Sequence, residues 1–299
     1  MAFYLEDKYI DPLTDFGFKR IFGTEPNKVL LIDFLNTLLP EHHRIRDITF
    51  KNTENIGYTP FDRRAIFDTY CQGENGDRFI VEVQKAKQNF FKDRSIFYAT
   101  FPIQEQAKQG IWDFQLKAVY SVGVLDFVLK DHQGEADFIH TVELKDQKCQ
   151  VFYDKLKFIY IELPKFTKSV EELDTQLDKW LFALRHLAEL SDRPQPLQEG
   201  VFSRLLDVAE IANFSRAEQE TYESSLKYYR DLNNVVNTSR QEGRQEGRQE
   251  GRQEGRQEGR QEGRQEGIYQ VAQTMKAAGV PSQEIATYTG LTLSEIERL

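Results

Sequence analysis

Apolar residues recur at helical spacing in the first forty positions of the chain. Residues 15–23 place three apolar side chains on one face of a predicted helix. Residues 26–40 form a second apolar stretch that predicts another helix, closed by Pro40. The chain therefore opens with two predicted helices that each have an apolar face to bury.

The middle of the chain changes to strand-like patterns and then returns to helical ones. Two β-branched and aromatic segments flank the sequence QGENG, which is typical of a hairpin turn. The predicted strands are 63–71, 77–84, 116–129, 136–144 and 157–163, and the predicted helices are 85–110, 169–190 and 201–214. This order predicts an α/β fold, a mixed central sheet with flanking helices and a helical C-terminal extension.

Seven tandem copies of RQEG occupy residues 240–267. The block has no apolar residue, and glycine at every fourth position weakens a helix, so we expect either a marginal helix or a flexible spacer. Residues 268–299 beyond it predict helix, turn, helix, turn, helix. This tail suits either a helix-turn-helix DNA reader or a module for self-association.

Composition narrows the class of protein. Hydrophobic residues make up 39% of the chain, and no apolar stretch is long enough to cross a membrane. The first residues carry acids where a signal peptide has basic residues, so we expect a cytoplasmic protein without membrane contact. The net charge of −9 argues against a protein that coats DNA, although a carboxylate metal site is compatible with it. Cys71 and Cys149 have no Cys or His neighbour at metal-ligand spacing, so we expect no zinc site, and the five histidines match no motif.

Two acids lie in the predicted hairpin among residues that should be buried. Side chains alternate along a strand, so Glu82 and Gln84 share one face, and antiparallel pairing brings Asp68 close to Glu82. Two buried carboxylates repel each other, and a divalent cation such as Mg²⁺ relieves both the repulsion and the cost of burial. The alternative is that both acids are structural and pair with Arg64 or Arg78.

Several segments together resemble a known family. They are the opening DPLTDFGFKRIFG with Asp15 and Lys19, the Asp68 strand, IVEVQ leading into a helix, and the tail that follows the repeat. Their order resembles the PD-(D/E)xK nucleases, and more specifically the Rpn family of recombination-promoting nucleases, also described as transposase-like proteins. The resemblance covers residues 1–130 and 240–299 well. It implies a restriction-endonuclease-like core over 1–165, a helical extension over 166–239, the repeat spacer and the tail.

The resemblance implies catalytic roles for three residues. Asp68 and Glu82 match the metal-binding acids, and Gln84 stands where the wider superfamily usually has lysine. A lysine there stabilises the charge that develops on phosphate, whereas an amide only orients water. Lys85 or Lys87 could supply the missing cation and contact DNA, although each also suits a solvated surface position.

Three further residues are candidates for the same site. Asp15 could be a third metal ligand, or an acid favoured at a helix N-terminus. Arg94 and Tyr98, one helical turn apart, could contact DNA phosphate, or Arg94 could form a salt bridge at the helix edge. The resulting hypothesis is a Mg²⁺-dependent DNA endonuclease that forms homo-oligomers and is linked to recombination or mobile elements. The alternative is a catalytically weak or inactive nuclease fold that binds DNA or assembles with itself.

Overall fold

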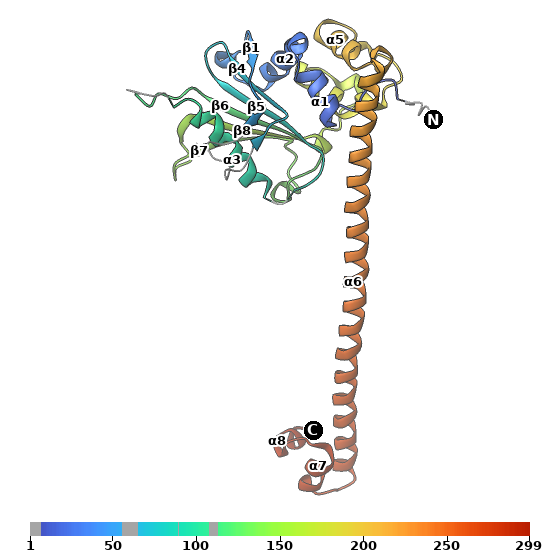
Figure 1. Cartoon of the computed structure of the whole chain (residues 1–299). Helices are drawn as coiled ribbons and strands as arrows, with labels where there is room; N and C mark the ends of the chain where they lie inside the picture. The colour runs from blue at the N-terminus through green and yellow to red at the C-terminus, as the bar shows by residue number, and fades with distance from the viewer. Residues whose placement is uncertain (1–6, 56–64, 89, 108–112) are drawn as a thin grey trace. The chain divides into compact units, whose positions relative to one another are not determined.

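A six-stranded mixed sheet forms the centre of the computed structural model, which describes residues 7–55, 65–88, 90–107 and 113–299. The strand order is β1-β4-β5-β6-β8-β7, and β5, β6 and β8 run parallel while the other neighbours are antiparallel. The strands are β1 Ile48–Phe50, β4 Thr69–Gly73, β5 Arg78–Gln84, β6 Val119–Leu125, β7 Ile139–Lys145 and β8 Val151–Glu162. A separate two-stranded ladder joins β2 Glu54–Asn55 to β3 Ala65–Ile66. The sheet and its helices are shown in Figure 1.

One face of the sheet carries the main hydrophobic core. The helices α1 Asp15–Phe22, α2 Lys28–Leu38, α4 Gln176–His186 and α5 Gly200–Ala209 contribute to it, and so does Tyr222 from the start of α6, Arg216–Ala277. Trp180 is fully buried in this core, with its ring 5.5 Å from that of Phe22 and 5.7 Å from that of Phe34. The strands present alternate apolar residues such as Val81 and Val122 to the same core, which leaves the intervening side chains for the opposite face.

Helix α3, Phe91–Gln104, packs on the opposite face. Phe91 meets Tyr160 of β8 with ring centroids 5.5 Å apart. Gly123 of β6 lies between Glu82 and Tyr160 in register, and a Cβ at Gly123 would meet the Tyr160 ring at 3.1 Å. Only a glycine therefore fits between these two side chains without displacing the aromatic ring.

Two predicted helices begin later than their sequence patterns suggested. Phe90, at φ 59°, is left-handed, so the helix predicted from residue 85 begins at Phe91, while residues 108–110 of that prediction lie outside the described part. In the helix predicted from 169, the capping box at Ser169 starts only a single 3₁₀ turn. The Thr175 hydroxyl accepts a hydrogen bond from the Asp178 amide, and this second capping box starts α4.

The strand predicted over 63–71 is interrupted at the position of its acid. The chain leaves β3 at Ile66 and enters β4 at Thr69, so Asp68 lies in the break, and residues 63–64 lie outside the described part. The Asp68 carboxylate accepts a hydrogen bond from the Val83 amide at 2.8 Å. A side-chain oxygen thus takes the place of a backbone acceptor at this end of the ladder.

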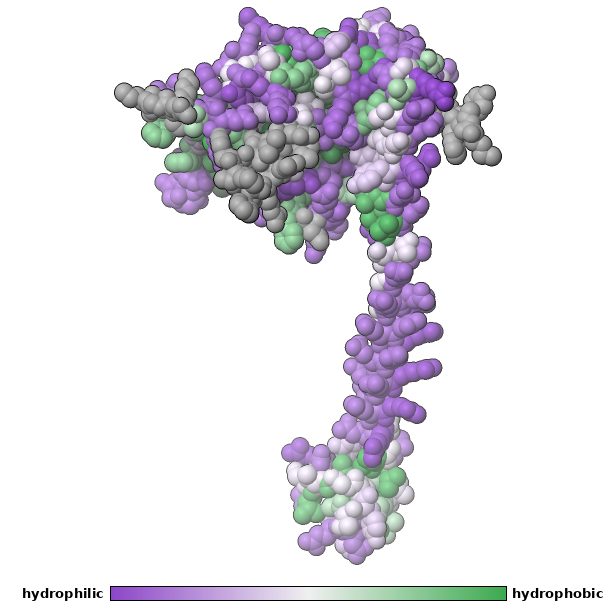
Figure 2. Space-filling model, viewed as in Figure 1, coloured by the Kyte–Doolittle hydropathy of each residue, from purple (hydrophilic) through white to green (hydrophobic). Residues whose placement is uncertain are grey.

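Helix α6 runs from Arg216 to Ala277 and includes the whole repeat. Of the two alternatives for the repeat, the structure has the helix. Every residue of 240–266 is exposed, and Figure 2 shows hydrophilic residues along this segment. The chain divides into two compact units, Met1–Arg230 and Asp231–Leu299. The described helices include none that is both long and apolar enough to cross a membrane.

The second unit has a small core of its own. The end of α6 packs with α7 Ser282–Thr289 and α8 Leu293–Arg298, as the helical pattern of the tail predicts. Ala272, Ile285 and Ile296 are fully buried, one from each helix. A capping box at Thr292 begins α8. The segment that follows the repeat therefore buries apolar residues of its own.

Candidate functional site

Asp68 and Glu82 face each other at the end of the β4–β5 ladder. Thr69 pairs with Val81, so one further step of the same antiparallel register places Asp68 opposite Glu82. Directly opposed residues of neighbouring strands project to the same face, which is the face covered by α3. Gln84 lies on this face by alternation. The structure thus brings the three predicted catalytic residues together.

Both carboxyl groups are partly buried, and their pKa values are raised. Burial raises the pKa of Glu82 to about 8, and the nearby Asp68 carboxylate adds to this shift. Burial also raises the pKa of Asp68 to about 6, against the hydrogen bond from Val83 and the positive charges of Lys19 and Arg94. The carboxyl group of Glu82 has no hydrogen-bonding partner within the part of the chain that the structure describes. Two neighbouring acids with raised pKa values suit a divalent cation, because its positive charge favours the ionised form of both.

Gln84 has both ends of its amide engaged. Its Nε2 donates to the Ala86 carbonyl at 3.0 Å, and its Oε1 accepts from the guanidinium of Arg94. Arg94 also donates to Gln88 and lies over the Tyr98 ring at 5.7 Å. A positive charge is therefore held next to the position at which the wider superfamily usually has lysine, but it comes from α3.

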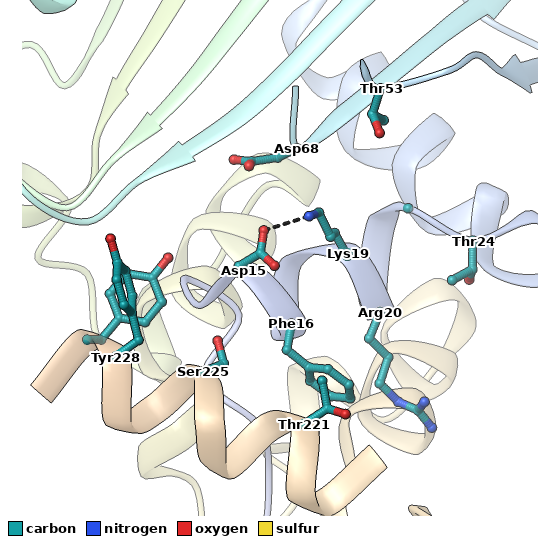
Figure 3. A pocket seen from close by; sticks show the side chains of 12 residues that line it. Asp15, Phe16, Lys19, Arg20, Thr24, Thr53, Asp68, Thr221, Ser225 and Tyr228 are labelled. Atoms are coloured by element: carbon teal, nitrogen blue, oxygen red, sulfur yellow. Dashed lines mark ion pairs between the residues drawn. The ribbon is translucent and has the colours of Figure 1, made fainter. Parts of the chain in front are cut away.

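A cavity of about 880 Å³ opens beside Asp68. Its lining includes Asp15 and Lys19 from α1 and the residues Thr221, Ser225, Tyr228 and Tyr229 from the first part of α6. Lys19 Nζ lies 2.8 Å from Asp15 Oδ1, and Figure 3 shows this pair between Asp68 and α6. The pair brings one acid and one cation to the cavity wall that also carries Asp68.

Asp15 does not complete a compact three-ligand cluster with Asp68 and Glu82. Across the described ranges, the group whose three ligand atoms all lie within 4.8 Å of one another consists of His132, Glu135 and His140. The Asp15 carboxylate is instead bound by Lys19, although its charge still raises the pKa of Asp68 after the larger effect of burial. Asp15 thus belongs to the electrostatic surroundings of the pair.

The predicted DNA-contacting lysines lie in different settings. Lys85 follows β5 on the opposite face from Gln84, where Asp11 binds its ammonium and the Tyr229 ring lies 5.3 Å away. Lys87 is exposed. Tyr98 is partly buried and meets Phe67 edge to face, with ring centroids 5.4 Å apart.

The start of α6 contributes residues that the local sequence patterns did not single out. Tyr222 is fully buried, and its hydroxyl accepts a hydrogen bond from the Asp11 amide at 2.7 Å. This contact docks α6 against the body and places Tyr228 and Tyr229 at the cavity. The sequence indicates Lys19 only as a member of the segment DPLTDFGFKRIFG, which carries the family resemblance. Its place at the cavity depends on the position of α1 relative to Asp68.

The comparisons with known proteins agree with this architecture. A family model described as PD-(D/E)XK nuclease family transposase matches residues 12–239, which contain the sheet, its helices and the Asp68–Glu82 site. No curated protein matches the chain. No solved structure matches it either. The match confirms the predicted family and the restriction-endonuclease-like α/β fold, and it supports a nuclease-type function. The chain belongs to the PD-(D/E)XK nuclease family transposases.

Proposed function

We propose that the protein is a metal-dependent DNA endonuclease and that Asp68 and Glu82 hold its divalent cation. The observation that carries the proposal is the opposed pair of partly buried carboxyl groups with raised pKa values at the end of β5. Oxygen ligands of this kind suit Mg²⁺, which takes one or two carboxylates and completes its shell with water and substrate phosphate. When bound, such an ion polarises the scissile phosphate and makes a bound water more acidic.

The side chains around Asp68 and Glu82 supply the positive charge that Gln84 lacks. Gln84 can hold a water through its amide but cannot neutralise the charge that develops on phosphate. Arg94, next to Gln84, and Lys19, on the wall of the same cavity as Asp68, are cations placed to meet this need. The Val83 amide fixes the Asp68 carboxylate through a 2.8 Å hydrogen bond, so the acid stays oriented toward Glu82.

The cavity beside Asp68 suits a nucleic acid strand. Its wall combines the Lys19 ammonium with the ring of Tyr228, which is 64% exposed. A cation pairs with phosphate, and an exposed aromatic ring gives a base a surface to stack on. Both features lie in the first unit, so the proposal needs no contribution from the tail.

A catalytically weak nuclease fold is the competing function, and Gln84 is the observation that favours it. The competing account predicts DNA binding or self-assembly with little cleavage. The two accounts differ in whether purified protein hydrolyses DNA, and a direct assay separates them.

The test is digestion of supercoiled plasmid by the full chain with Mg²⁺ or with EDTA. We expect nicked and linear products with Mg²⁺ only, and a loss of cleavage in Asp68→Asn. Glu74→Gln is the matched control, because Glu74 is an exposed carboxylate in the turn of the same hairpin. Cleavage by Asp68→Asn at the rate of Glu74→Gln would place the chemistry elsewhere.

A further inference from the structure

Two histidines and a glutamate come together at the far edge of the sheet. His132 ends the short 3₁₀ helix Lys130–His132, and His140 is the second residue of β7. Glu135 lies in the loop between them and is exposed. One ligand atom from each of the three lies within 4.8 Å of the other two. The group therefore has the number and type of donors that hold a transition-metal ion.

A buried carboxylate behind the group orients its first histidine. Glu162, at the end of β8, is fully buried. Its Oε1 accepts from the Leu129 amide at 2.8 Å and lies 2.9 Å from His132 Nδ1. A carboxylate that accepts a hydrogen bond from one ring N–H of a neutral imidazole leaves the other nitrogen unprotonated and available as a ligand. The contact therefore directs Nε2 of His132 away from Glu162.

The second histidine, His140, has a ring nitrogen that makes no hydrogen bond. His140 Nε2 is buried without a hydrogen bond, and its nearest charged partner is Glu162 Oε2 at 3.5 Å. The rings of His132 and His140 stack with centroids 3.7 Å apart and 23° between their planes. A metal ion lies in the plane of each imidazole that binds it, so one ring rotates out of this stack on binding. Ligands at about 2.1 Å from a tetrahedral ion are about 3.4 Å apart, so the group also contracts.

Charge favours a dication at this position. Lys165 Nζ lies 2.8 Å from Glu162 Oε2, and this contact balances the charge of the buried carboxylate. Glu135 then leaves the group with one net negative charge while both histidines are neutral. Imidazole nitrogens favour Zn²⁺ and similar ions over Mg²⁺, which prefers oxygen ligands.

We propose that His132, Glu135 and His140 form a binding site for Zn²⁺ or a similar transition-metal ion, with Glu162 positioning His132. The ion would join the connection after β6 to the edge strand β7. His140 is in register with Tyr160, Gly123 and Glu82, three strand spacings from Glu82, or roughly 14 Å at about 4.8 Å per strand. Ions that act together on one phosphate lie only about 4 Å apart, so this site is structural and independent of the proposed cleavage.

The test is a titration of the metal-free full chain with Zn²⁺ against a competing chromogenic chelator, in excess Mg²⁺ to saturate oxygen sites. We expect one tightly bound Zn²⁺ per chain and a rise in melting temperature. Glu135→Gln and His132→Gln should weaken binding at least tenfold. Because Glu135 is exposed, its replacement leaves the fold intact, which circular dichroism checks.

Two controls separate this site from others. His186 pairs with Glu189 at 2.8 Å three residues away, so His186→Gln removes a comparable histidine and should leave binding unchanged. Asp68→Asn should also keep the ion. The proposal is overturned if the wild-type chain binds no Zn²⁺, if Glu135→Gln binds it as tightly as wild type, or if Asp68→Asn alone loses it.

Discussion

Replacing Glu82 by glutamine should stabilise the metal-free protein at alkaline pH. Glutamine has the shape of the protonated glutamic acid and cannot ionise. Burial, aided by the charge of Asp68, raises the pKa of Glu82 from 4.5 to about 8. At about 1.36 kcal/mol per pKa unit, full ionisation in the folded protein costs up to about 5 kcal/mol. We expect a gain of about 2 to 5 kcal/mol, or roughly 5 to 15 °C in melting temperature.

The pH range of this effect follows from the direction of the shift. Below pH 4.5 the carboxyl group is neutral in both the folded and the unfolded chain, so wild type and variant should be equally stable. Between pH 4.5 and 8 the unfolded chain loses the proton while the folded chain keeps it, and the wild type is progressively destabilised. Above pH 8 the difference should be constant.

The assay is urea unfolding in EDTA at pH 4 and pH 9, followed by the fluorescence of the buried Trp180. Glu74→Gln serves as the control: it keeps Glu82, so its stability should follow that of the wild type at both pH values. Adding Mg²⁺ at pH 9 should stabilise the wild type and leave Glu82→Gln unchanged, because only the wild type keeps both ligands. Equal stability of wild type and Glu82→Gln at pH 9, or a gain of the same size at pH 4, would refute the reasoning.

Four further predictions concern the surroundings of the site and the repeat. Lys19→Met should lower single-turnover cleavage by about 10²-fold, and Gln84→Lys in that background should restore part of it; an unchanged rate in Lys19→Met would remove this cation from the mechanism. Gly123→Val should destabilise the body by about 1 to 3 kcal/mol in urea, because its added atoms crowd the Tyr160 ring; unchanged stability would show that the ring can move. Deleting two RQEG units should leave the cleavage rate and the melting temperature of the body unchanged, and a fall in either would mean that the repeat contributes to the body. Replacing the seven repeat glycines by alanine should favour the helix by about 1 kcal/mol each, seen as slower amide exchange in this segment; faster exchange would contradict a helical repeat.

The hairpin that carries Asp68 and Glu82 could be predicted, because its geometry depends on residues close together in the sequence. Strand alternation and a short turn are enough to place Asp68 opposite Glu82 and to put Gln84 on the same face. The break at Asp68 could not be foreseen, since it depends on the hydrogen bond that the carboxylate accepts from Val83. Likewise, α3 begins late because Phe90 adopts a left-handed conformation. The sequence does not predict this, since glycine and not phenylalanine is the usual residue at such a position.

The cavity and the histidine group depend on tertiary contacts, which the hydrophobic periodicity of the sequence does not predict. Tyr228 reaches the cavity because Tyr222, six residues earlier, docks α6 through the Asp11 amide. His132 and His140 meet because β7 pairs with β8, whose last residue, Glu162, lies behind both rings. The spacing around the two cysteines therefore does not indicate a transition-metal site. The proposed site becomes apparent only where the fold brings His132, Glu135 and His140 together at the edge of the sheet.

The most direct test of the central claim is to locate the bound cation by anomalous scattering in crystals grown with Mn²⁺ in place of Mg²⁺. We predict a peak between Asp68 and Glu82, bonded to a carboxylate oxygen of each, and no peak there in Glu82→Gln. Density for Mn²⁺ at another position, with the Asp68–Glu82 pair unliganded under conditions that support DNA cleavage, would contradict the proposed site.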